Sequence, residues 1–211
     1  MAKRCHGGLT GARLVPAAGS PYSRPVEYHP SLPIDTNRLR LRPFTRGDVE
    51  AVFSYRSRED VTRFLYDDPT SREAVAEAIQ ARVGHDHFAD EGDKIFLAVE
   101  RRADGAMMGE TSLILRSTQS RQVEIGYIFH PDYQGHGYAT EAARALLAMA
   151  FAGAGAHRVF ARCHAHNEAS RRVMERIGMQ AEAHFREHQF TKGRWDEEIV
   201  CAILEGAWPT A

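Results

Sequence analysis

The chain has 211 residues, of which 43% are hydrophobic and 26% charged, and a formal net charge of −1. These values are typical of one globular domain with a single core, and the small net charge argues against nucleic acid or a membrane surface as a partner. No apolar run approaches the roughly 20 residues that span a membrane, and no apolar leader opens the chain. Three scattered cysteines without metal-ligand spacing indicate a reducing compartment, so we expect a cytoplasmic protein.

Residues 1–33 are predicted to be an N-terminal extension. They contain five of the nine prolines, together with clusters of Gly, Ala and Ser, and show no hydrophobic period. We expect this segment to be flexible and mildly basic, and residues 34–211 to form the ordered domain. The extension could instead fold over the domain or reach a neighbouring subunit, and the sequence leaves these alternatives open.

The first half of the domain shows the periods of a strand, two helices and a pair of strands. The expected ranges, in chain order, are 39–44, 45–53, 70–83, 94–100 and 107–115. Both helices begin with a pattern typical of a capping box, Thr45 with Asp48 and Thr70 with Glu73.

The second half begins with a strand of alternating apolar residues, followed by a glycine-containing turn and a long helix. Another strand, a second helix and a final hairpin complete the pattern. The expected ranges are 122–129, 137–152, 157–164 and 167–177, then 179–190 and 195–204 for the hairpin. Gly178 is expected to close the second helix, and Lys192 with Gly193 to form the hairpin turn.

Residues 134–139, Gln-Gly-His-Gly-Tyr-Ala, lie between a predicted strand and the start of a helix. Glycines leave the backbone amides accessible, and a helix N-terminus adds the positive end of a dipole, so this segment is suited to bind phosphate. A nucleotide-hydrolysing P-loop would need Lys-Ser/Thr after its last glycine, where this chain has Tyr138 and Ala139. A dinucleotide fingerprint would need a third glycine where Thr140 stands.

The same residues resemble the acetyl-CoA pyrophosphate loop, Q/R-x-x-G-x-G/A, of the GNAT N-acetyltransferase superfamily, with Gln134, Gly137 and Ala139 at its defining positions. Residues 167–179 resemble the second cofactor-binding helix of that superfamily, with Arg176 and Met179 as departures from its pattern. The order of predicted elements over residues 36–208 is also similar. Two segments resemble the ribosomal-protein N-terminal (alanine/serine) acetyltransferase branch: residues 36–42 match its opening T-x-R-L-x-L-R, and residues 193–197, Gly-Arg-Trp-Asp-Glu, resemble its G-x-W-x-D loop.

The resemblance implies an α+β acyl-CoA N-acyltransferase fold, with a twisted, mixed and mostly antiparallel sheet flanked by helices. It also implies acetyl-CoA as co-substrate and no metal ion. The cofactor-binding positions that it implies are Ile128, Phe129 and His130 on the strand, Gln134, Gly135, His136, Gly137, Tyr138, Ala139 and Thr140 in the loop, and Asn167, Ser170 and Arg171 on the second helix.

Several of these positions have an ordinary structural role as an alternative. Residues 134–140 could form a turn used only for packing. Asn167 is a preferred N-cap residue, and by resemblance its side chain contacts the pantetheine amide; both roles can hold together. Ser170 could protonate the leaving sulfur or be a surface hydroxyl, and Arg171 could reach the 3′-phosphate or belong to a solvated face. His136 could assist phosphate binding or face solvent.

Acetyl transfer to an amine requires removal of a proton from the ammonium group, and needs no metal or covalent enzyme intermediate. Glu124 is the first candidate base, because it lies in the strand beside the expected thioester, where burial would raise its pKa. Glu110, on the neighbouring strand, is the second. Glu124 could instead be a charge on an exposed face. Tyr127 is a poorer candidate, because it alternates with Ile125 on the apolar face of its strand.

The final hairpin is expected to border the acceptor pocket. Trp195 and Asp196 suit a cationic amine, through cation–π contact and ion pairing, although Trp195 could pack under the sheet and Asp196 could close the turn. Tyr66 and His166 are further candidates for contact with the substrate. No metal site is predicted, since His164 and His166 lack the further ligands that zinc requires.

These expectations combine into an acetyl-CoA-dependent N-acetyltransferase in which a bound primary amine attacks the thioester directly. The branch resemblance favours the N-terminal amine of a protein, particularly a ribosomal protein, and a small-molecule amine or antibiotic is the alternative. A non-catalytic acyl-CoA-binding sensor is a further hypothesis, although a pure binder would need no base. We expect a monomer or homodimer.

Overall fold

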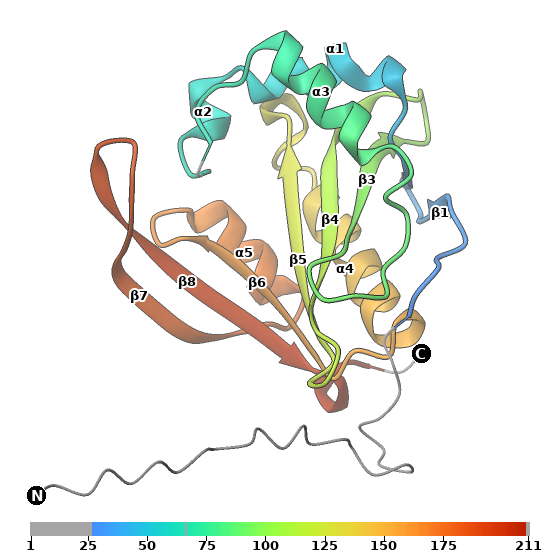
Figure 1. Ribbon diagram of the computed structural model, residues 1–211, viewed down its shortest axis with the longest axis vertical. Coiled ribbons are helices and arrows are strands. Elements are labelled where there is room, and N and C mark those ends of the chain that lie inside the picture. The colour runs from blue at the N-terminus through green and yellow to red at the C-terminus, as the bar shows by residue number, and fades with distance from the viewer. Residues whose placement is uncertain (1–26, 66, 210–211) are drawn as a thin grey trace, which may run out of the picture.

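The computed structural model describes residues 27–65 and 67–209, which form one eight-stranded sheet flanked by helices (Figure 1). The sheet order is β1-β2-β3-β4-β5-β6-β8-β7. The strands are β1 (Ile34–Asp35), β2 (Leu39–Pro43), β3 (Lys94–Arg101), β4 (Met107–Ser117), β5 (Gln122–Phe129), β6 (Arg158–His164), β7 (Gln180–Thr191) and β8 (Arg194–Leu204). The helices are α1 (Val49–Arg56), α2 (Glu59–Thr62), α3 (Arg72–Arg82), α4 (Tyr138–Ala148) and α5 (Glu168–Arg176). The expected α+β architecture is confirmed.

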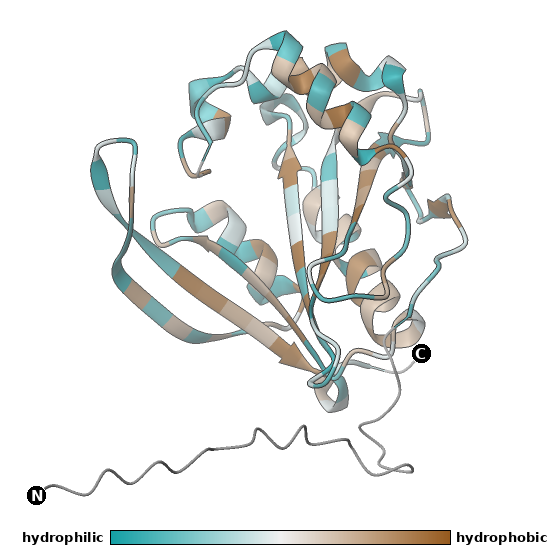
Figure 2. Ribbon diagram, in the orientation of Figure 1, coloured by the Kyte–Doolittle hydropathy of each residue, from teal (hydrophilic) through white to brown (hydrophobic). Residues whose placement is uncertain are grey.

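Alternation along the strands divides the apolar residues between two cores, one on each face of the sheet. On β3, Leu97 and Val99 belong to a large cluster that includes α4, whereas Phe96 and Ala98 belong to a smaller cluster with α1 and α3. Hydrophobic residues accordingly recur along the central strands, while the hairpin tip is mostly hydrophilic (Figure 2). The face with α1 and α3 is called the upper face below.

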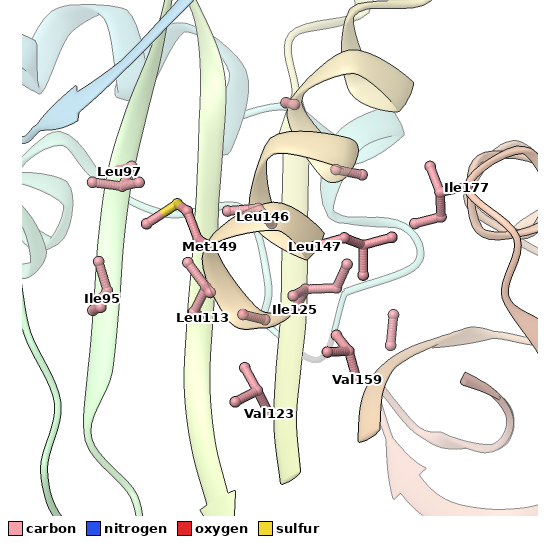
Figure 3. Packing of buried hydrophobic residues seen from close by; sticks show 14 of the residues in the cluster. Ile95, Leu97, Leu113, Val123, Ile125, Leu146, Leu147, Met149, Val159 and Ile177 are labelled. Carbon is pink, nitrogen blue, oxygen red and sulfur yellow. The ribbon is translucent and has the colours of Figure 1, made fainter. Parts of the chain in front are cut away.

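Helix α4 is held in place by the larger core. Leu146 and Leu147 are fully buried and lie beside Leu113 and Ile125 of the central strands (Figure 3). Burial of side chains of this size contributes about 1.5–3 kcal/mol each. This packing fixes the N-terminus of α4 next to the end of β5.

Strands β5 and β6 are the parallel neighbours in a sheet whose other neighbours are antiparallel. They pair only from Gln122 to Glu124 on β5, against Arg158 to Phe160 on β6. Beyond that point the two strands diverge (Figure 1). The facing edges of residues 125–129 and 161–164 are therefore left without a strand partner.

The structure refines several expected element bounds. The expected pairing of Thr45 with Asp48 is present, since Thr45 N donates to Asp48 Oδ2 at 2.7 Å. The second expected capping box is wrong: the N-cap of α3 is Ser71, whose hydroxyl accepts from Ala74 N at 3.2 Å. The long helix ends as an α-helix at Ala148 and continues as a π-helical turn over Met149–Gly153. Strand β1 and helix α2 were not expected, because both are too short to show a period.

The described part of the predicted extension already contacts the domain at Tyr28. Its backbone exchanges hydrogen bonds of 2.8 and 3.1 Å with Phe88. Its ring also lies against Gly153, where an added Cβ would come within 2.5 Å of it. Residues 1–26 lie outside the described residues. Across 27–65 and 67–209, none of the helices has the length and apolar character needed to cross a bilayer.

Candidate functional site

The loop between β5 and α4 presents a row of free backbone amides. Gly135 and Gly137 both have φ of +80°, a conformation that favours glycine. Helix α4 begins at Tyr138, and Glu141 N is the first amide to bond back, to Gly137 O at 3.1 Å. Among the residues that the structure describes, the amides of 135–140 therefore have no acceptor. Such a row at the positive end of a helix dipole fits a diphosphate.

Side chains of the loop maintain its shape. Gln134 Nε2 donates to Phe129 O at 3.4 Å, which ties the loop to the last residue of β5. The Nδ1 atom of His136 lies 2.8 Å from Gln134 O. Ala139 packs against the large core and Thr140 is buried, so both face away from a ligand at the amides.

The end of β5 has one paired edge and one unpaired edge. Ile128 and Phe129 pair with β4, and His130 N donates to Met108 O at 2.8 Å, which extends that ladder. The edge that faces β6 is free from residue 125 onward. An extended chain with amide groups, such as pantetheine, can bond to this edge in the manner of an added strand.

Helix α5 begins opposite this edge with Asn167 as its N-cap. Asn167 Oδ1 accepts from Ser170 N at 3.1 Å, which leaves the side-chain NH₂ available to a ligand carbonyl. Ser170 Oγ lies 3.1 Å from the hydroxyl of Tyr127. Burial raises the pKa of Tyr127, so this phenol stays protonated. Arg171 is half-exposed and pairs with Glu175 at 3.4 Å.

Glu110 lies in a buried cluster of charges on the upper face. Its carboxylate accepts from Tyr55 Oη and Arg82 Nη1, both at 3.0 Å, and from Arg56 Nη2. Burial alone would raise the pKa of Glu110, but the charges of Arg56 and Arg82 outweigh it and lower the pKa below its ordinary value. Glu110 is therefore a weak proton acceptor at neutral pH.

Glu124 belongs to a chain of alternating charges that crosses the sheet. Its two carboxylate oxygens lie 2.6 Å from Arg116 Nε and 2.9 Å from Arg162 Nε, and Arg162 Nη1 lies 3.5 Å from Glu198. Glu124 is in the last residue pair between β5 and β6, opposite Phe160. Because Arg162 lies two residues beyond Phe160, its ion pair with Glu124 joins the strands where they separate.

An acidic hollow lies between the segment after α2 and the β7–β8 hairpin. Its lining contains three carboxylates and two imidazoles, and comprises Phe64, Leu65, His164, His188, Gln189, Asp196, Glu197 and Glu198. His164 and Glu198, on the sheet side of the hollow, are opposite each other in the β6–β8 register, so their side chains lie on the same face. Arg162, which pairs with Glu124, is two residues before His164 on β6 and so lies on that face too. The hollow therefore opens on the upper face.

Asp196 is oriented by two neighbours within this hollow. His164 Nε2 lies 3.1 Å and Arg194 Nε 2.8 Å from the same oxygen, Asp196 Oδ1. His166 N donates to His164 Nδ1 at 3.1 Å, so the proton of neutral His164 is on Nε2 and points to Asp196. Burial would raise the pKa of Asp196, but the hydrogen bonds from Arg194 and His164 outweigh it and lower the pKa. Among the described residues, Asp196 Oδ2 has no partner and can accept from a ligand.

The other expected acceptor residues lie apart from Asp196. Trp195 alternates with Asp196 along β8, is 58% exposed and packs edge-on against Phe190 at 5.3 Å, so the two expected partners do not face one ligand together. The ring of His166 lies beside His164, at 5.3 Å between centroids. Tyr66 lies outside the described residues.

Lys192 ties the hairpin tip to the segment that follows α2. Its ammonium donates to Thr62 O at 2.8 Å and to Asp67 O at 2.7 Å. The two walls of the hollow are thus joined at one end. In the described part of the chain, no group of three or more His, Cys, Asp or Glu side chains is placed to hold a metal ion.

Residues 134–140 form the candidate phosphate-binding loop, called the phosphate-binding loop below. Arg38 lies at this loop and was not singled out in the sequence analysis. Its Nη1 atom donates to His136 O at 3.0 Å. The T-x-R-L pattern that contains Arg38 was visible, but its partner lies 98 residues further along the chain.

Comparison with known proteins agrees with this geometry. A family model described as acetyltransferase (GNAT) domain matches residues 38–180. The uncharacterized N-acetyltransferase YnaD of Bacillus subtilis (strain 168) is 32% identical over 175 residues, which cover 83% of this chain and 98% of that protein. Spermidine N(1)-acetyltransferase of Escherichia coli (strain K12) is 25% identical over 167 residues, covering 79% of this chain and 86% of that protein. The crystal structure of a GNAT-family acetyltransferase from Bacillus anthracis aligns with a TM-score of 0.74 at 31% identity, covering 83% of this chain and 99% of that chain.

We expect Glu110→Gln to lower the free energy of unfolding at pH 7 by about 3 kcal/mol, because it leaves two mostly buried guanidinium groups, those of Arg56 and Arg82, without their carboxylate. The lowered pKa means that this contribution is complete above the ordinary carboxyl pKa of about 4.3 and is lost as the pH falls below it. Urea denaturation at several pH values should show the difference between the wild type and the variant shrinking below about pH 4.3. Glu50→Gln is the control, because it breaks only an exposed ion pair with Arg72. It should leave the free energy of unfolding in urea unchanged. A difference that stays constant down to pH 3 would contradict this account.

Proposed function

This chain belongs to the GNAT family of acetyltransferases, which use acetyl-CoA, and we propose that its acceptor is a primary amine that enters the acidic hollow as an ammonium group. The observation that carries the proposal is the carboxylate of Asp196, which is buried, ionised and oriented by His164 and Arg194. A buried carboxylate with one free oxygen suits a cation that brings its own hydrogen-bond donors.

The donor side of the site fits acetyl-CoA. The free amides of residues 135–140 suit its diphosphate, and the unpaired edge of β5 suits its pantetheine amides. The thioester supplies an electrophilic carbonyl carbon, which the amine nitrogen attacks as the bond to sulfur breaks. We assign the free amides at the edge of β5 to hold the pantetheine arm and the NH₂ group of Asn167 to bind one of its carbonyls.

Two protons must move during this reaction. The ammonium must lose one proton before it can attack, and we assign that step to Glu124, directly or through water, because it shares the upper face with the hollow. Glu110 is the weaker candidate, since the charges of Arg56 and Arg82 lower its pKa. As the bond to sulfur breaks, the nitrogen loses its second proton and the departing thiolate takes one up; we assign this transfer to the hydroxyl of Ser170, which relays the proton and is backed by the protonated phenol of Tyr127.

The identity of the amine is proposed in two forms. Residues 193–197, Gly-Arg-Trp-Asp-Glu, resemble the G-x-W-x-D loop of the ribosomal-protein branch, which supports the N-terminus of a protein, particularly a ribosomal protein. The relative that is named a spermidine acetyltransferase supports a small polyamine instead. The three carboxylates in the hollow favour a cationic acceptor in either form. Cytoplasmic location, a monomeric or homodimeric state and the extension over residues 1–33 remain predictions from the sequence.

A panel of acceptors tests this function. The full chain is incubated with acetyl-CoA and either peptides with a free N-terminal Ala or Ser, spermidine, or an aminoglycoside, and release of the CoA thiol is followed with a chromogenic reagent. We expect release that depends on the amine and is absent with the corresponding N-acetylated compound. Tight acetyl-CoA binding with no turnover across the panel would favour the non-catalytic sensor and contradict the proposal.

We expect Asp196→Asn to lower kcat/KM for the amine by about tenfold to hundredfold, because one charge-assisted contact to the ammonium is lost. The KM for acetyl-CoA should stay within about twofold, since the donor contacts are made elsewhere. The control is Glu182→Gln, which removes a carboxylate of β7 that pairs with Arg158 at the far end of β6. A loss of equal size in the affinity for both substrates would argue against a specific role in amine binding.

We expect Glu124→Gln to lower kcat by roughly a hundredfold or more, because it removes the group that accepts the proton. The amide keeps the size of the side chain, and the KM for acetyl-CoA should change little. Glu100→Gln is the matched control, since Glu100 is also a partly buried carboxylate paired with an arginine, Arg42, at 2.8 Å. An undiminished kcat between pH 6 and 9 would remove Glu124 as the base.

A further inference from the structure

Thr36 and Arg38, at the start of the domain, bond to the first turn of α4 through one carboxylate. Glu141 Oε1 accepts from Thr36 Oγ1 at 2.6 Å and from Arg38 N at 2.9 Å, and Glu141 Oε2 accepts from Arg38 Nε at 2.7 Å. Burial would raise the pKa of Glu141, but these bonds outweigh it and lower the pKa. Glu141 is therefore ionised and directed toward the β1–β2 turn.

The guanidinium of Arg38 is thereby placed over the phosphate-binding loop. Its Nη1 atom donates to His136 O at 3.0 Å, and its Cζ atom lies 4.6 Å from the centre of the Tyr138 ring. Its Nη2 atom lies 3.6 Å from the position that a Cβ on Gly137 would occupy. Within residues 27–65 and 67–209, Nη2 has no hydrogen-bond partner, and the side chain of Arg38 is 48% exposed.

We propose that Arg38 is a donor-specificity residue that binds the diphosphate of CoA and so favours CoA thioesters over thioesters of pantetheine that lack this group. The free amides of residues 135–140 supply dipoles but no full charge, and a diphosphate carries at least two negative charges. The free NH₂ group of Arg38 supplies the missing cation in a planar geometry that matches phosphate oxygens. Its other nitrogens are used to fix its position.

Glu141 holds Arg38 for this task without competing with the ligand. A carboxylate in the first turn of a helix would repel an anion bound at the same N-terminus. Here both of its oxygens already accept hydrogen bonds from Thr36 and Arg38. The ion pair therefore fixes the position of Arg38, and the group that it offers to the ligand is the free NH₂ of the guanidinium.

Arg40 provides a matched comparison close by. It lies on β2, two residues after Arg38, is exposed to a similar extent and forms an ion pair with Asp35 at 2.8 Å. It has no bond to the phosphate-binding loop. Replacing Arg40 removes the same charge from a neighbouring position without touching the candidate diphosphate site.

The inference rests on the use of CoA thioesters and is independent of the acceptor, so its test uses binding alone. Dissociation constants of the full chain and of Arg38→Met and Arg40→Met are measured by calorimetry for CoA and 3′-dephospho-CoA, and by competition for pantetheine. We expect Arg38→Met to weaken both diphosphate ligands about tenfold or more, and pantetheine less than twofold. Arg40→Met should match the wild type for all three.

Two results would overturn the inference. Equal weakening of CoA and pantetheine would mean that Arg38 only supports the local structure. Weakening of CoA but not of 3′-dephospho-CoA would move its contact to the 3′-phosphate. Arg38→Lys guards against misfolding, since it keeps the charge but cannot make the same set of planar bonds; we expect it to bind both diphosphate ligands with intermediate affinity. Affinity of Arg38→Lys for CoA no better than that of Arg38→Met, with the wild-type melting temperature, would contradict a role of the charge.

Discussion

The early separation of β5 and β6 is the constraint on which the rest of the site depends. A parallel pair needs a crossover connection, and α4 provides it, so the phosphate-binding loop necessarily follows the end of β5. Pairing stops after Glu124 and Phe160, which leaves backbone groups on two facing edges. Unpaired strand edges are usually avoided in proteins, and in the proposed function the pantetheine arm of the acetyl donor supplies the missing partner.

Charges on the upper face compensate for the separation. The Glu124–Arg162 pair joins the two strands where their hydrogen bonds end, and Arg116 and Glu198 continue the chain to either side. Glu110 is enclosed in a separate cluster with Arg56 and Arg82. Both candidate bases, Glu124 and Glu110, thus also form ion pairs that stabilise the fold. Their positions in the structure, and not the sequence pattern, distinguish the candidate base from the buried structural carboxylate.

Local patterns were sufficient to predict most of the fold, because strand alternation, helix periods and turn residues act over a few positions. The glycine-containing loop before α4 was predictable for the same reason, and its binding of phosphate stays a prediction. The partners of Glu110 were not, since Arg56 and Arg82 lie 54 and 28 residues away. Strand alternation places the consecutive residues Trp195 and Asp196 on opposite faces of β8, so the expectation that both contact one amine conflicted with the strand predicted for the same residues. Ser71 replaced Thr70 as N-cap because adjacent hydroxyl residues compete for one position, and the sequence pattern does not choose between them.

The bonds from Lys192 to Thr62 and Asp67 have a consequence for how such a protein can diversify. The proposed donor site lies on β5, α4 and α5, which are anchored in the large core. The proposed acceptor hollow is bounded by the short segment after α2 and by a hairpin tip, joined to each other rather than to that core. Substitutions in these two surface segments can therefore exchange one amine for another while the source of the acetyl group stays the same, so the two halves of the reaction can evolve at different rates.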